Sequence, residues 1–267
     1  MAKKNLNQMS FLDHLEDLRW LLVRSSAAVV IMAIATYFIS DFLFDTIIFG
    51  PTRPTFFTYV FFCDLARELG VESICITDLS FIIQNTEMEG QVNIFVWMCI
   101  LSGFILSFPY ILWEIWKFIS PALYSNEKKH ARVFIFVSSL LFFLGVLFGY
   151  YVIIPMSINF VATFTISDVV INQFTINSYV GLVKTSVLAG GLFFELPIII
   201  YFLTSLGLVT PVLLRKYWKY AVIAILIIAA IVTPPDVVSQ TIVALPMLII
   251  YEISILISKF VYKNKKD

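Results

Sequence analysis

The segment Val133-Phe-Ile-Phe-Val-Ser-Ser-Leu-Leu-Phe-Phe-Leu-Gly-Val-Leu-Phe-Gly-Tyr-Tyr-Val-Ile-Ile154 contains 22 residues and no charged side chain. A helix of about 20 apolar residues is what a bilayer core of about 30 Å requires. An unpaired backbone amide in lipid costs several kcal/mol, so a segment of this kind must be helical in a membrane. The segment therefore predicts a transmembrane helix.

Five further apolar segments extend this prediction to the whole chain. The 267 residues are 60% hydrophobic and only 13% charged, whereas soluble domains are about 25% charged. We predict one all-α integral membrane domain over residues 1–267 with six transmembrane helices. The five further spans are expected at about Trp20–Ser40, Val92–Trp113, Thr185–Leu206, Tyr220–Val232 and Val237–Ile257.

The last two spans are expected to be short. The fifth segment would measure only about 20 Å as a helix, which is less than the bilayer core. We expect the membrane to thin around the last two spans, or the two to form a hairpin that does not cross fully. Pro109, Pro197 and Pro246 predict kinks in the second, fourth and sixth spans.

The basic residues predict the orientation. Of the 18 Lys and Arg residues, all but Arg53, Arg67 and Lys184 fall at segment ends or loops that alternate to one side of the membrane. Cytoplasmic loops carry an excess of basic residues. We therefore predict six spans with the N- and C-termini both cytoplasmic.

The opposite side would hold an enlarged outer loop, residues 41–91. Within it, Tyr59–Leu69 is typical of a short amphipathic helix that ends at Gly70. Cys63 and Cys75 also fall there, and either form a disulfide or remain two thiols. A second outer turn, Thr233-Pro-Pro-Asp236, leaves Asp236 to cap the last span.

Several function classes are excluded by what the chain lacks. The net charge is zero, so no basic surface suggests nucleic acid. With two histidines and no Cys-x-x-Cys pair, a metal site is not expected. No P-loop, His-Glu-x-x-His or Gly-x-Ser-x-Gly motif occurs. We expect no enzymatic activity and no cofactor.

Acidic residues are the candidate functional groups at the cytoplasmic side. Residues 1–19 are predicted to form a cytoplasmic amphipathic helix, with Glu16 and Asp17 near Arg19. These acids either complement the helix dipole or bind a basic ligand, since a carboxylate accepts two hydrogen bonds from a guanidinium. Glu127 is the only acid in the loop between spans two and three, where pairing with Lys128 is the simpler explanation.

Glu195 lies at the centre of the predicted fourth span. A carboxylate there costs at least about 2.5 kcal/mol, so it must be neutral, paired or next to a wet cavity. It is either a functional group or a buried structural acid. Glu252, closer to the end of the sixth span, can instead reach water by snorkelling.

Four motifs in order along this six-span frame resemble the TatC family, the multispanning core subunit of the twin-arginine (Sec-independent) protein translocase. They are His14-Leu-Glu-Asp-Leu-Arg19, Phe118-Ile-Ser-Pro-Ala-Leu-Tyr124 with Glu127, Phe194-Glu-Leu-Pro197, and Thr233-Pro-Pro-Asp-Val-Val-Ser-Gln240 continuing to Ala244-Leu-Pro246. The likeness covers nearly the whole chain outside the first outer loop.

This resemblance implies a multi-pass protein of the bacterial cytoplasmic membrane that binds twin-arginine signal peptides of folded cargo proteins. It implies TatA and/or TatB single-span partners, a homo-oligomer within the receptor complex, and transport driven by the proton-motive force. Matching positions assign signal-peptide binding to Asp17, Arg19, Phe118 and Glu127. They place Glu195 and Gln240 on the intramembrane, concave face, and Pro51 and Asp236 on the outer face.

Two departures from the family pattern qualify these assignments. The family usually has Glu where this chain has Asp17, so Glu16 can share or take over its role. The first outer loop is unusually long, and nothing is transferred onto residues 54–91. Two other hypotheses remain open: an ion-coupled secondary transporter of small solutes with Glu195 as proton carrier, and a purely structural scaffold.

Overall fold

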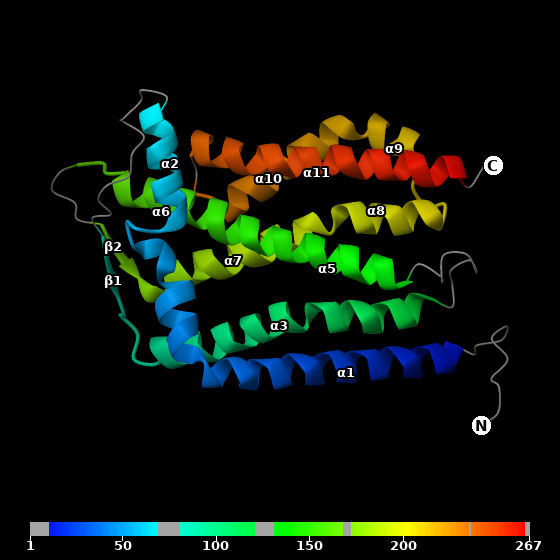
Figure 1. The fold of residues 1–267 in the computed structure, drawn as a ribbon, viewed down its shortest axis with the longest axis horizontal. Coiled ribbons are helices and arrows are strands. Elements are labelled where there is room, and N and C mark those ends of the chain that lie inside the picture. The colour runs from blue at the N-terminus through cyan, green and yellow to red at the C-terminus, as the bar shows by residue number, and fades with distance from the viewer. Residues whose placement is uncertain (1–10, 69–80, 121–130, 168–171, 235, 265–267) are drawn as a thin grey trace. The chain divides into compact units, whose positions relative to one another are not determined.

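The structure is a computed structural model that describes residues 11–68, 81–120, 131–167, 172–234 and 236–264 (Figure 1). Helices dominate it, with two short strands and two π-helical segments, Phe42–Ile48 and Gly149–Ile153. The helices and strands are α1 (Phe11–Phe38), α2 (Phe57–Glu68), β1 (Ile82–Gln84), α3 (Gly90–Ile119), α5 (Ala131–Phe148), α6 (Ile154–Thr163), β2 (Gln173–Thr175), α7 (Ile176–Phe194), α8 (Leu196–Ser205), α9 (Pro211–Lys216), α10 (Trp218–Val232) and α11 (Val237–Asn264).

The structure confirms the predicted fold class, a helical membrane protein. Five helical stretches in the described residues are long and apolar enough to cross a membrane: His14–Phe38, Gly90–Ile119, Val133–Thr163, Ile176–Ser205 and Ser239–Lys263. The sixth apolar helix, α10, has 15 residues, or about 22 Å. It is short, as predicted for the fifth span.

The prediction that the last span is also short is wrong, because α11 has 28 residues. The helix continues beyond the apolar segment since residues 258–264 contain neither Gly nor Pro. Pro246 lies inside α11, and Pro109 lies inside α3, without ending either helix. Only Pro197 coincides with a break, where α7 ends and α8 begins.

The third and fourth spans are among those that are longer than the sequence predicted. The helix of the fourth begins at Ile176 instead of Thr185, because the hydroxyl of Thr175 caps it by accepting a hydrogen bond from the Ser178 amide at 3.3 Å. The third continues past Ile154 to Thr163. The π-helix Gly149–Ile153 ends two residues before Pro155, and π-segments of this kind interrupt the regular helical ladder without ending a helix.

The chain forms two compact units, of which the first comprises Met1–Ser40 and Phe95–Leu140. In it α1 runs beside α3. A Cβ on Gly103 would lie 2.6 Å from the backbone nitrogen of Ala33, so only glycine allows this approach. Nearby, the Thr36 hydroxyl donates to the Cys99 carbonyl at 3.2 Å.

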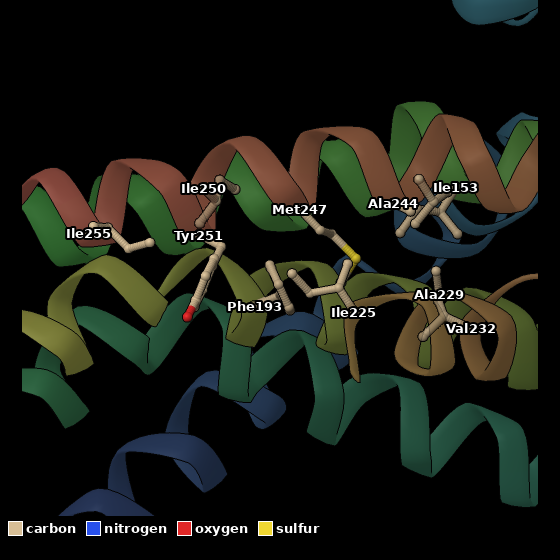
Figure 2. Close-up of a cluster of buried hydrophobic side chains, with 11 residues drawn as sticks. Ile153, Phe193, Ile225, Ala229, Val232, Ala244, Met247, Ile250, Tyr251 and Ile255 are labelled. Atoms are coloured by element: carbon tan, nitrogen blue, oxygen red, sulfur yellow. The ribbon is translucent and has the colours of Figure 1, made fainter. Parts of the chain in front are cut away.

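The second unit comprises Asp41–Ile94 and Leu141–Asp267. An apolar cluster in this unit joins α7, α10 and α11, with Phe193, Ile225 and Met247 facing one another (Figure 2). Because lipid is as apolar as these side chains, close packing holds the helices together more than exclusion from water does.

The described part of residues 41–91 contains α2, which confirms the predicted short helix. Tyr59 is 1% exposed, and its hydroxyl donates to the Pro51 carbonyl at 3.0 Å. Burial raises the pKa of the Tyr59 phenol far above its ordinary value. Cys63 is disulfide-bonded, whereas Cys75 and Gly70 lie outside the described residues.

The parallel pair β1–β2 was not predicted. Ile82 aligns with Gln173, and Gln84 aligns with Thr175. Each strand has three residues, and their partners come from distant loops, so no local alternation could reveal them. The pairing connects the described part of residues 41–91 with the segment that precedes α7.

Glycines set the distance between α5 and α7 in the second unit. A Cβ on Gly145 would collide with the carbonyl oxygen of Gly190, and one on Gly190 would collide with the carbonyl oxygen of Gly145. By contrast, a Cβ on Gly181 meets nothing within 4 Å. The small-xxx-small pair Gly145 and Gly149 therefore serves helix packing.

We expect Gly145→Ala to lower the stability of the detergent-solubilised protein by about 1–3 kcal/mol, because backbone on the facing helix must move. Gly181→Ala is the control, and should be neutral or stabilise by up to about 1 kcal/mol through higher helix propensity. Thermal unfolding measures both. Equal effects of the two substitutions would contradict the packing role of Gly145.

Candidate functional site

The predicted acidic residues of the amino-terminal helix lie on α1 with their side chains exposed. Glu16, Asp17 and Arg19 are all open to solvent or ligand. Among the residues that the structure describes, neither carboxylate is in an ion pair. The Arg19 guanidinium instead lies 5.7 Å from the centre of the Trp20 ring, a cation–π distance. The two acids are thus available to a cationic ligand.

An aromatic contact fixes this part of α1 to the end of α3. The rings of His14 and Phe118 stack with centroids 4.3 Å apart and planes inclined by 20°. Phe118 is half-buried and comes one residue before the end of α3. The structure therefore brings Phe118 together with the helix that carries Glu16 and Asp17. Glu127 lies outside the described residues, so its predicted proximity stays a prediction.

A buried ion cluster next to this contact was missed by the sequence analysis. Glu114 is 3% exposed, and its carboxylate accepts hydrogen bonds from Lys117 Nζ at 2.7 Å and from an Arg24 guanidinium nitrogen at 3.4 Å. The signal was present in Trp113-Glu-Ile-Trp-Lys117, where an acid inside an apolar segment has a base three residues later. The cluster ties α1 to α3.

Glu195 belongs to the second unit and marks the break between α7 and α8. Its side chain is 6% exposed. Its backbone carbonyl accepts from the amides of Ile198 and Ile199 at 3.0 Å, so the residue also starts α8. Glu195 is therefore buried at a break in the helix, and whether it is a functional group or a structural acid stays open.

The other predicted positions of the second unit have structural contacts. Asp236 Oδ2 accepts from the Ser239 amide at 2.7 Å, which confirms that it caps α11. The Gln240 side-chain amide donates to the Leu226 carbonyl at 3.0 Å and joins α11 to α10. Pro51 is buried beneath Tyr59.

The carboxylate of Glu252, in the carboxy-terminal half of α11, makes a further contact between helices. It accepts from Trp218 Nε1 at 2.7 Å and from Arg215 at 3.1 Å. This acid is therefore held by partners on α9 and α10. Within the described residues, no group of three or more His, Cys, Asp and Glu side chains is placed to hold a metal ion.

The Asp236 cap is testable on its own. Asp236→Ala should destabilise the protein by about 1 kcal/mol, because one amide at the start of α11 loses its acceptor. Asp236→Asn, which keeps an acceptor oxygen without the charge, should stay within about 0.3 kcal/mol of the parent chain. Thermal unfolding in detergent measures both. If Asp236→Asn destabilises the protein as much as Asp236→Ala does, the negative charge of Asp236 and not its capping hydrogen bond stabilises α11.

Comparisons with known proteins give the family. The model of the family "Sec-independent protein translocase protein (TatC)" matches residues 13–246. A TatC protein of Blattabacterium sp. subsp. Periplaneta americana is 42% identical over 98% of this chain and 100% of its own. The TatCy protein of Bacillus subtilis is 36% identical over 99% of this chain and 94% of its own.

A solved structure agrees with these sequence matches. The crystal structure of a twin-arginine translocase receptor, TatC, superposes with a TM-score of 0.71 and 29% identity, covering 93% of this chain and 99% of that one. These matches give no support to the alternative of a small-solute transporter. Sequence and fold agree, and the chain belongs to the TatC family of Sec-independent protein translocase proteins.

Proposed function

We propose that this chain is the receptor subunit of a twin-arginine translocation system and binds the signal peptides of folded cargo proteins. The observation that carries this proposal is the exposed pair Glu16 and Asp17 on α1, next to the stacked contact between His14 and Phe118. Family membership supplies the transport role. The chain itself performs no covalent chemistry.

Recognition rests on charge and geometry. A guanidinium donates two parallel hydrogen bonds to one carboxylate, so two adjacent arginines need two acidic positions. Asp17 provides one, with Glu16 beside it, and Glu127 provides the other. Phe118 offers an aromatic face for a guanidinium. Arg19 stays beside the Trp20 ring, which leaves the neighbouring acids to the signal peptide.

The basic residues support an orientation with both termini in the cytoplasm of a bacterium and six spans, α10 included. All but three of the 18 Lys and Arg residues then face inward or lie at the inner helix ends. Because α10 has 15 residues, the bilayer thins beside it. Pro51 and Asp236 belong to the outer face in this arrangement.

Transport requires partners that this chain does not contain. TatA and/or TatB single-span subunits join it, several copies of the chain assemble in the receptor complex, and the proton-motive force drives cargo across. The apolar part of the signal moves along a concave face that includes Glu195 and Gln240. The burial of Glu195 and the break in its helix support a role in that movement.

Simultaneous Asp17→Asn and Glu127→Gln should reduce photocrosslinking of a twin-arginine signal peptide by more than tenfold. Each charge-assisted hydrogen bond contributes about 1.5–3 kcal/mol, and the site loses two of its acceptor charges. The measurement is the crosslinked fraction in membranes that contain equal amounts of each variant.

The control is the pair Asp64→Asn and Glu68→Gln on α2, which removes the same charge from exposed positions of the outer loop. It should leave crosslinking unchanged. Undiminished crosslinking in the Asp17 and Glu127 double variant would remove the receptor assignment of these residues.

A further inference from the structure

A groove of about 430 Å³ lies between α1 and α3 in the first unit. The two helices are antiparallel, since Thr36 contacts Cys99 at one end whereas Arg24 contacts Glu114 toward the other. The groove begins at Arg24 and Tyr110, and its walls continue along Ala28, Ile31 and Leu106. The alanines and Ser107 leave the space that larger side chains would fill.

The groove has the length of one membrane leaflet. From Arg24 to Met32, α1 rises about 12 Å, close to half the thickness of a hydrocarbon core of about 30 Å. Ile31 is 65% exposed and Leu106 is 46% exposed. The walls are therefore apolar and open from the side, as an acyl chain requires.

The mouth of the groove carries excess positive charge. The Glu114 carboxylate is held at 2.7 Å by Lys117 and only at 3.4 Å by Arg24. One carboxylate thus faces two cations. The Arg24 side chain remains 52% exposed, and a guanidinium has five N–H donors, of which one is directed to Glu114. The remaining donors can bind an anion.

We propose that this groove binds a phospholipid with a net negative headgroup. Its phosphate would accept hydrogen bonds from Arg24 beside Tyr110, and one acyl chain would lie along Ala28, Ile31 and Leu106. Basic pockets between transmembrane helices select anionic headgroups in this way. A zwitterionic lipid would bind less tightly, because its ammonium group is repelled by the Arg24 guanidinium. A cationic peptide would be repelled by Arg24 as well.

Native mass spectrometry of the full chain in mild detergent tests the proposal. The protein is titrated with phosphatidylglycerol and, separately, with phosphatidylethanolamine that has identical acyl chains. We expect about fivefold tighter binding of phosphatidylglycerol, the factor associated with one basic residue near an anionic headgroup. Arg24→Gln should abolish this preference, whereas Arg67→Gln on α2 should preserve it.

Two further variants separate lipid binding from helix pairing. Glu114→Gln removes the acid that competes for Arg24, so the preference should persist or increase although the ion pair is lost. Ala28→Phe fills the groove and should weaken binding of both lipids. The proposal would be overturned if the parent chain bound the two lipids equally, or if Arg24→Gln kept the preference for phosphatidylglycerol. It would also be overturned if Glu114→Gln lost that preference, or if Ala28→Phe bound both lipids as tightly as the parent chain does.

Discussion

The pairing of α1 with α3 is the constraint on which the proposed recognition site depends. Only 6% of the apolar stretch of α1 is buried, against 39% for α3, so few contacts hold the helix. They are distributed along its whole length: Thr36 at Cys99, the close approach at Gly103, Arg24 at Glu114, and His14 on Phe118. The position of the exposed carboxylates Glu16 and Asp17 follows from this series of contacts.

The acidic side chains within the apolar helices have different surroundings along the chain. Glu114 is compensated by two cations within its own unit, and Glu252 by an arginine and an indole N–H. Glu195 is placed at a helix break. Since an uncompensated charge in lipid is costly, the first two serve helix association. Glu195 thus marks the junction between α7 and α8.

The helical membrane fold follows from composition, because lipid leaves the backbone few alternatives. The cap at Asp236 and the short helix α2 were likewise predicted from local sequence. Other features depend on contacts between distant segments and could not be read locally. The pairing of β1 with β2 and the contact of Arg24 with Glu114 are of this kind. The length of α11 was missed because the end of an apolar segment is not the end of a helix.

For the candidate site, the family resemblance suggested candidate residues, and the structure adds how some of them are positioned. Phe118 lies against the helix that bears Asp17, an arrangement that spacing alone does not predict. Asp236 and Pro51, assigned to the outer face by resemblance, have clear structural roles as a cap and as an acceptor for Tyr59. The acceptor pair for two arginines still depends on Glu127, which the described residues do not include.

The most direct measurement is therefore the sidedness of positions 17 and 127. Asp17→Cys and Glu127→Cys, each in a chain with Cys99→Ser, can be labelled with a membrane-impermeant maleimide in right-side-out and inverted vesicles. Both cysteines should react only in inverted vesicles, where the cytoplasmic face is accessible. Reaction of the two positions from opposite faces would contradict a shared binding site for a pair of arginines.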